Sequence, residues 1–132
     1  MSVIFALGRE FDSVIMAYKT NSRNKKEMEK LPRSVRKFAD EYPEVWQAFN
    51  RLGDECHQAG PLDEKMRRLV KIGLAVGAGL EGATHSAVRN AIDAAITAEE
   101  IRHVVVLSMT TLGFPEAIRA MMWVDDCLSK VE

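Results

Sequence analysis

The 132-residue chain contains two cysteines, Cys56 and Cys127, and they lie far apart in the sequence. They form neither a C-x-x-C motif nor a spacing typical of metal ligands. The residue pattern therefore offers no dithiol redox centre, and we expect no metal site and no cofactor. In a reducing compartment both side chains are expected to be free thiols.

An excess of one charge and a long apolar run are also missing. The formal net charge is −1, which gives no argument for a nucleic-acid or membrane-surface partner. No apolar stretch approaches the length of a transmembrane helix. Arg9, Glu10 and Asp12 interrupt the apolar N-terminal residues, and no basic segment precedes them, so this region does not resemble a signal peptide. We expect a cytoplasmic protein.

The apolar residues present are spaced as in α-helices. Near the N-terminus they recur every three or four residues, which predicts an amphipathic helix over residues 2–19; they are Ile4, Leu7, Phe11, Val14, Ile15 and Tyr18. Residues 20–30 are polar and are expected to be a solvated linker or a frayed helix end. We therefore predict an amphipathic arm over residues 1–20, a polar linker over 21–31 and a helical domain over 32–132.

Proline, glycine and capping residues divide the remaining chain into helices. A short helix should end before Pro43, which suits the first turn of the next helix. The buried face of that helix is predicted to contain Val45, Trp46, Phe49, Leu52 and Cys56. Further helices are predicted over residues 64–79, 81–95 and 98–112, followed by a last helix after the Gly113–Pro115 turn.

Two capping signals support these assignments. Asp63 is a plausible N-cap for residues 64–79, and Thr97 with Glu100 forms a capping box that opens residues 98–112. The β-branched run Val104–Leu107 could alone be interpreted as a buried strand. The capping box favours a helix there, so the predicted fold class is all-α.

Four segments carry a resemblance to a known family. Their sequences are YPEVWQAFNRL at 42–52, LDEKMRRL at 62–69, TAEEI at 97–101 and LGFPEAIRAM at 112–121. Together they resemble the carboxymuconolactone decarboxylase and alkylhydroperoxidase-D-like family over about residues 32–130. The resemblance implies an alkylhydroperoxidase-D-like helical bundle of about six or seven helices. It also implies a homo-oligomer, often a trimer or hexamer.

The reactive residues of that family are replaced in this chain. We aligned the chain with the family pattern from the TAEEI segment, without gaps. Leu80 and Ala83 then occupy the positions of the family's two cysteines. Ala87 occupies the position of its histidine, and Arg68 occupies the position of its glutamate. In redox members, the resemblance implies, one thiolate attacks peroxide, a second thiol one turn away closes a disulfide, and the glutamate and histidine relay the proton. The decarboxylase branch lacks the cysteines but keeps the histidine. We therefore expect a redox-inactive member.

Five residues are candidates for lining a residual ligand pocket: Arg68, Leu80, Ala83, Ala87 and His85. An arginine at position 68 could bind an anionic ligand bidentately. The alternative is a salt bridge with Glu64 or Glu81.

The helical wheel sets His85 apart from the other candidates on the same helix. It projects about 160° away from Ala87 on a helical wheel. It shares its face with Glu81 and Arg89, which suits a surface or interface residue.

Three functions remain open. The first is a redox-inactive protein that binds a small molecule, an anionic one included, or acts only as an oligomeric scaffold. The second is a decarboxylase acting on an acidic lactone, with Arg68 and His85 holding the carboxylates. The third is a thiol-dependent peroxidase that uses Cys56 or Cys127. The amphipathic arm and the glycine-rich helix after Asp63 are expected to pack between subunits.

Overall fold

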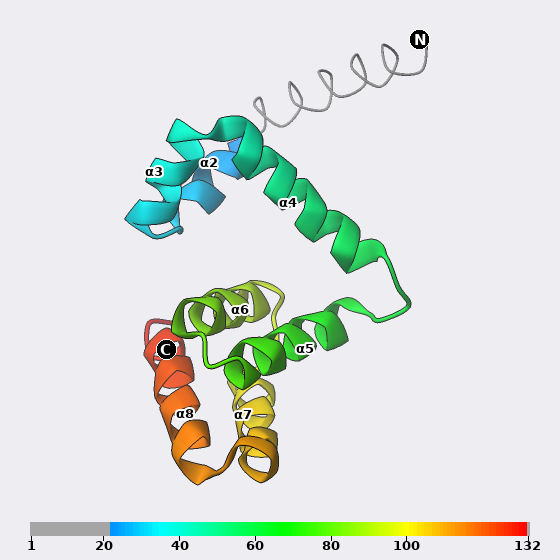
Figure 1. Cartoon of the computed structure of the whole chain (residues 1–132), viewed down its shortest axis with the longest axis vertical. Coiled ribbons are helices and arrows are strands. Elements are labelled where there is room, and N and C mark those ends of the chain that lie inside the picture. The colour runs from blue at the N-terminus through cyan, green and yellow to red at the C-terminus, as the bar shows by residue number, and fades with distance from the viewer. Residues whose placement is uncertain (1–21, 132) are drawn as a thin grey trace. The chain divides into compact units, whose positions relative to one another are not determined.

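The computed structural model describes residues 22–131. Over that range the chain forms α-helices and no strand, which confirms the all-α prediction (Figure 1). The helices are α2 (Ser22–Glu29), α3 (Arg33–Glu41), α4 (Pro43–Gln58), α5 (Glu64–Gly77), α6 (Glu81–Asp93), α7 (Ala98–Leu112) and α8 (Phe114–Leu128). The amphipathic helix predicted over residues 2–19 lies outside the described residues. None of the described helices is long and apolar enough to cross a membrane.

The chain divides into two compact units at the junction between Ala59 and Gly60. The first contains α2, α3 and α4, and the second contains α5 to α8. This boundary falls inside residues 32–132, which the sequence analysis treats as one helical domain. Residues 22–29, within the predicted polar linker, form α2.

The predicted capping residues begin their helices as expected. The side chain of Asp63 accepts a hydrogen bond of 2.8 Å from the backbone N–H of Met66 at the start of α5. At the start of α7 the hydroxyl of Thr97 accepts from the Glu100 N–H at 3.2 Å, and the Glu100 carboxylate accepts from the Thr97 N–H at 3.0 Å. The β-branched run Val104–Leu107 therefore lies within a helix, α7, as predicted.

The ends of α5 and α6 come earlier than the predicted residues 79 and 95. Past the end of α5, Gly79 has φ of 67°, and the Leu80 N–H returns to the Ala75 carbonyl at 3.1 Å. Past the end of α6, Ala95 has φ of 60°, and the Ile96 N–H donates a hydrogen bond of 3.0 Å to the carbonyl of Ala91 in the last turn. Both ends are Schellman motifs, in which a left-handed residue stops the helix.

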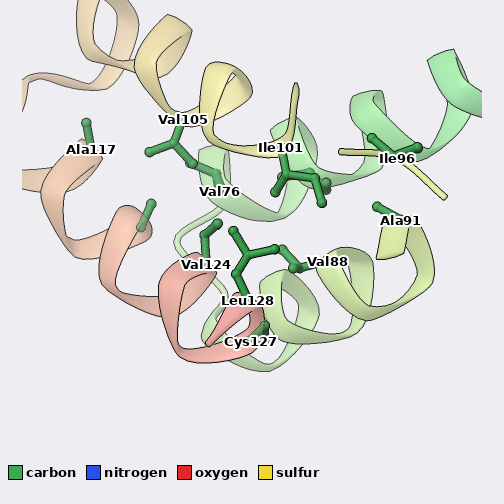
Figure 2. Close-up of a cluster of buried hydrophobic side chains, with 12 residues drawn as sticks. Val76, Val88, Ala91, Ile96, Ile101, Val105, Ala117, Val124, Cys127 and Leu128 are labelled. Atoms are coloured by element: carbon green, nitrogen blue, oxygen red, sulfur yellow. The ribbon is translucent and has the colours of Figure 1, made fainter. Parts of the chain in front are cut away.

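The second unit is built around one buried apolar cluster (Figure 2). In it α5 packs against α6 and α7, and α8 packs against the same two helices. The most buried large side chains are Ile72, Val88, Ile101, Val105 and Val124, so every helix of the unit contributes. A Cβ added at Gly73 would lie 3.8 Å from Val104 of α7, which is an ordinary contact distance, so the α5–α7 packing does not require glycine there.

The buried face predicted for α4 is wrong for the described residues. Val45 is 55% exposed, Phe49 63% and Leu52 59%, and Cys56 is exposed as well. Within its unit α4 packs against α3, which is a short helix with one buried residue, Ala39. The spacing correctly identifies an apolar face, but a sequence pattern does not contain the surface that would cover it.

Candidate functional site

Arg68 lies in the second turn of α5 and is held by an acidic side chain on the same helix. Its Nε donates to one carboxylate oxygen of Glu64 at 2.7 Å. The other oxygen of Glu64 accepts from Nη2 of Arg67 at 2.8 Å. Nη1 of Arg67 donates to the carbonyl of Leu62. One carboxylate therefore bridges two guanidinium groups, which is the salt bridge that the sequence analysis gave as the alternative to a bound anion.

These contacts keep Glu64 ionised. The hydrogen bonds from Arg68 and then Arg67 lower the pKa of the Glu64 carboxyl below its ordinary value of 4.5. The Arg68 side chain is only 24% exposed, whereas that of Glu64 is 47% exposed. Solvent thus screens the pair in part, and its contribution to stability is modest.

The N-terminal end of α6 contains Leu80 and the buried Thr84. Leu80 is the N-cap residue, and its side chain, which is 55% exposed, has no polar atom with which to cap the helix. Its carbonyl accepts from both the N–H and the hydroxyl of Thr84, at 2.9 and 2.8 Å. Thr84 is fully buried, so this internal hydrogen bond satisfies a hydroxyl that burial would otherwise penalise.

The other α6 candidates differ in their surroundings. Ala83 is exposed, whereas Ala87 is partly buried and packs against the core. His85 is half-buried, and its Nε2 is buried with no hydrogen-bond partner among the described residues. The carbonyl of His85 lies 3.9 Å from Sγ of Cys127 in α8. His85 is therefore more enclosed than the surface position that the wheel suggested.

Arg68 and the start of α6 lie at different levels of the α5–α6 pair. The two helices run back along each other after a short turn (Figure 1). Arg68 is nine residues before the end of α5, or about 14 Å at 1.5 Å per residue. Leu80 comes three residues after that end, so Ala87, further along α6, is the α6 candidate nearest the level of Arg68. The described hydrogen bonds join Arg68 to Glu64 and to none of the α6 candidates.

A different arginine reaches the turn at Leu80. The guanidinium of Arg119 in α8 lies 3.4 Å from the point where a Cβ would sit on Gly79. Arg119 also forms an ion pair with Glu116 and stacks over Trp123, 5.2 Å from the ring centroid. The sequence analysis did not nominate Arg119, and the i, i+3 and i, i+4 spacing of these three residues on one helix is the signal that could have indicated it.

The two thiols have different environments. Cys127 is buried in the core of the second unit, and this burial raises the pKa of its thiol above the ordinary value of 9.0. Cys56 is exposed on α4 in the other unit. No cluster of three or more metal-ligating side chains occurs among residues 22–131.

Comparison with known proteins assigns the family. The description of the matching model is carboxymuconolactone decarboxylase family, and it matches residues 43–126, from the first residue of α4 into the last turns of α8. A search of curated proteins gave no match. Since the family model covers almost two thirds of the sequence, the chain belongs to the carboxymuconolactone decarboxylase family.

Proposed function

We propose that this protein is a redox-inactive member of the carboxymuconolactone decarboxylase family that acts as a homo-oligomeric helical scaffold. The observation that carries the proposal is the chemistry of three side chains, Leu80, Ala83 and Ala87. Each is a hydrocarbon, and a hydrocarbon neither ionises, attacks peroxide nor closes a disulfide. Arg68 adds a permanent cation, which cannot accept a proton at neutral pH.

The remaining thiols support this proposal. The thiolate is the reactive form of cysteine, and burial in an apolar core disfavours it at Cys127. Cys56 is exposed, but it lies on α4 among apolar residues, with no described ion pair or hydrogen bond to its sulfur. A thiol peroxidase needs a thiolate and a resolving partner, and neither cysteine has a described partner thiol.

Exposed apolar side chains on the second unit support assembly. Met66, Val70 and Leu74 follow one another at four-residue steps along α5 and are 47%, 48% and 66% exposed. Phe114 and Met122 of α8 are about as exposed. Single exposed apolar residues are ordinary, but an aligned row is typical of a surface that contacts another protein. A second copy of the chain, as a trimer or hexamer, is the proposed partner.

The scaffold proposal is tested by two measurements on the full chain. Peroxide consumption with a dithiol reductant should not exceed that of the Cys56→Ser, Cys127→Ser double variant. Sedimentation should give an oligomer that Val70→Asp shifts toward monomer, whereas the control Lys71→Asp, at an exposed charged position of the same helix, should leave it intact. Thiol-dependent turnover would overturn redox inactivity, and a concentration-independent monomer would overturn the scaffold role.

A second candidate function is the binding of a small anion at Arg68. The observation that favours it is the partly buried guanidinium, which has a planar fork suited to a carboxylate. Binding to the native state would raise the melting temperature in the presence of dicarboxylates. Arg68→Ala should erase that rise and the control Lys71→Ala should keep it. An unchanged melting curve for wild type would reject this candidate, and with it the decarboxylase alternative that uses Arg68 to hold an acidic lactone.

A further inference from the structure

The order of residues along α4 is self-complementary. Val45, Phe49, Leu52 and Cys56 follow one another at steps of four, three and four residues, which keeps them on one side of the helix. All four are exposed, and we call them the α4 seam. Their exposure does not identify a partner, but their order along the helix and the residues beside them do.

The seam is arranged symmetrically about its own midpoint, between positions 50 and 51. Phe49 and Leu52 lie equally far from this midpoint, and so do Val45 and Cys56. When two such helices pack antiparallel about a two-fold axis at the midpoint, Phe49 of each copy meets Leu52 of the other, and Val45 meets Cys56. A two-fold interface requires this self-complementarity, because both copies present the same patch.

The residues beside the seam fit the antiparallel direction. Trp46 and Gly53 flank one side of it, and Ala48 flanks the other. In the antiparallel pair Trp46 lies beside Gly53 of the second copy. A Cβ built on Gly53 meets nothing within 4 Å, so there is space for the indole ring of that copy. A parallel pair would instead place Trp46 beside the charged Glu41 and Gly53 beside Ala48, which leaves this space unfilled.

The exposed apolar area also fits a second copy of the chain. Half-exposed side chains of this size leave on the order of 400 Å² of apolar surface open on each helix. Two copies would together cover about 800 Å², and since about 65% of a homodimer interface is apolar, the whole interface would measure about 1,200 Å². Specific interfaces begin at about this size, so the pair should dissociate on dilution.

We propose that two copies of this chain pair through their α4 seams, antiparallel and about a two-fold axis. The inference goes beyond the proposed function, because it gives the first unit an interface of its own. The oligomer surface around Val70 belongs to α5 of the second unit. The two interfaces share no residue, so each can be tested without the other.

The exposed Cys56 makes the pairing measurable in the full chain. Val45→Cys, under mild copper–phenanthroline oxidation, should give a covalent dimer whose disulfide joins positions 45 and 56, as peptide mapping can establish. These positions lie about 16 Å apart along one helix, so the bond forms only between two chains. Wild type should give at least tenfold less dimer, because the antiparallel pair also holds its two Cys56 thiols about 16 Å apart along the axis.

Two further variants test whether the seam itself directs the cross-link. The matched control is Glu44→Cys, which is exposed and lies next to position 45 but about 100° around the helix, on the side away from Phe49. Its cross-linking to Cys56 should be at least tenfold slower than that of Val45→Cys. Adding Phe49→Asp to Val45→Cys should slow the reaction by a similar factor, because it places a charge near the centre of the seam.

The outcomes separate this inference from the proposed oligomer. Equal rates for Val45→Cys and Glu44→Cys, or no dimer with either, would overturn the inference, because a second copy would then not cover the seam. A faster dimer in wild type, joined through Cys56 alone, would indicate a parallel pair and would overturn it as well. The cross-link should persist when Val70→Asp is added, and its loss there would show that the seam does not pair by itself.

Discussion

Replacing Ala95 by glycine should stabilise this protein. Ala95 has φ of 60°, and it is the one residue other than glycine with a positive φ among residues 22–131. It ends α6 in a Schellman motif, where its own N–H bonds to the Ile92 carbonyl at 2.9 Å. Ala95 is exposed, so removing its methyl group gives up little buried surface.

The expected gain follows from two opposing terms. An L-residue with a Cβ pays roughly 1–2 kcal/mol for the left-handed conformation. Glycine avoids that cost but loses about 0.5–1 kcal/mol more than alanine in chain entropy on folding. The difference predicts that Ala95→Gly raises the free energy of unfolding by about 0.5–1 kcal/mol, which corresponds to roughly 2–5 °C in melting temperature.

Gly79 provides the reverse substitution in an equivalent setting. It occupies the same position of the Schellman motif that ends α5, with φ of 67°. Gly79→Ala should therefore lose about what Ala95→Gly gains, because its new Cβ would lie 3.4 Å from the flexible end of Arg119, at an ordinary contact distance. The two changes leave the net charge unaltered and can be compared at one pH.

Urea unfolding followed by helical circular dichroism measures both variants. The midpoint should rise for Ala95→Gly and fall for Gly79→Ala, with the slope against urea unchanged in each. A lower midpoint for Ala95→Gly at unchanged slope would refute the argument, because it would show that the left-handed turn costs alanine nothing here.

Three further predictions concern the ion pairs and the core. Glu64→Gln should cost about 0.5–1 kcal/mol at neutral pH by uncoupling Arg68. Because the folded pKa of Glu64 is lowered, this contribution is present above its ordinary pKa and disappears as the pH falls through the lowered value, so unfolding curves of variant and wild type should converge in acid. In the Cys56→Ala background, Cys127 should resist a maleimide until the protein unfolds, and reaction of the native protein within seconds would contradict its burial. Ile101→Ala removes a fully buried side chain and should cost about 2–5 kcal/mol in urea unfolding; a cost under 1 kcal/mol would contradict the described core.

Helix beginnings were predictable because their signals are local. Asp63 and the Thr97–Glu100 pair accept hydrogen bonds from backbone groups at most three residues away, so the sequence contains both partners. The same capping box correctly favoured a helix for the run around Val105, against its β-branched composition. Where donor and acceptor are neighbours in the chain, residue types and spacing suffice.

Helix ends and packing partners were harder to predict. Nothing in the identity of Ala95 indicates a left-handed conformation, since alanine is the strongest helix former. The spacing around Phe49 correctly predicted that the apolar residues share one face of the helix. It wrongly predicted that this face is buried, because burial depends on a partner surface that the pattern does not specify. Arg119 reaches Gly79 only through the packing of α8 near the α5–α6 turn, and no local motif relates the two residues.

The charges near the candidate site bear directly on what it could bind. Both oxygens of Glu64 are occupied, one by Arg68 and one by Arg67, and Arg119 is likewise held by Glu116. The described hydrogen bond from Arg68 to Glu64 uses Nε of the guanidinium, and the lowered pKa of Glu64 keeps this carboxylate charged at neutral pH. A ligand anion at the Nη groups would therefore lie near a fixed negative charge, which reduces its electrostatic gain. A monocarboxylate offers little beyond what Glu64 already supplies, so a ligand with additional apolar or charged contacts along α6 toward Ala87 is the kind that this arrangement favours.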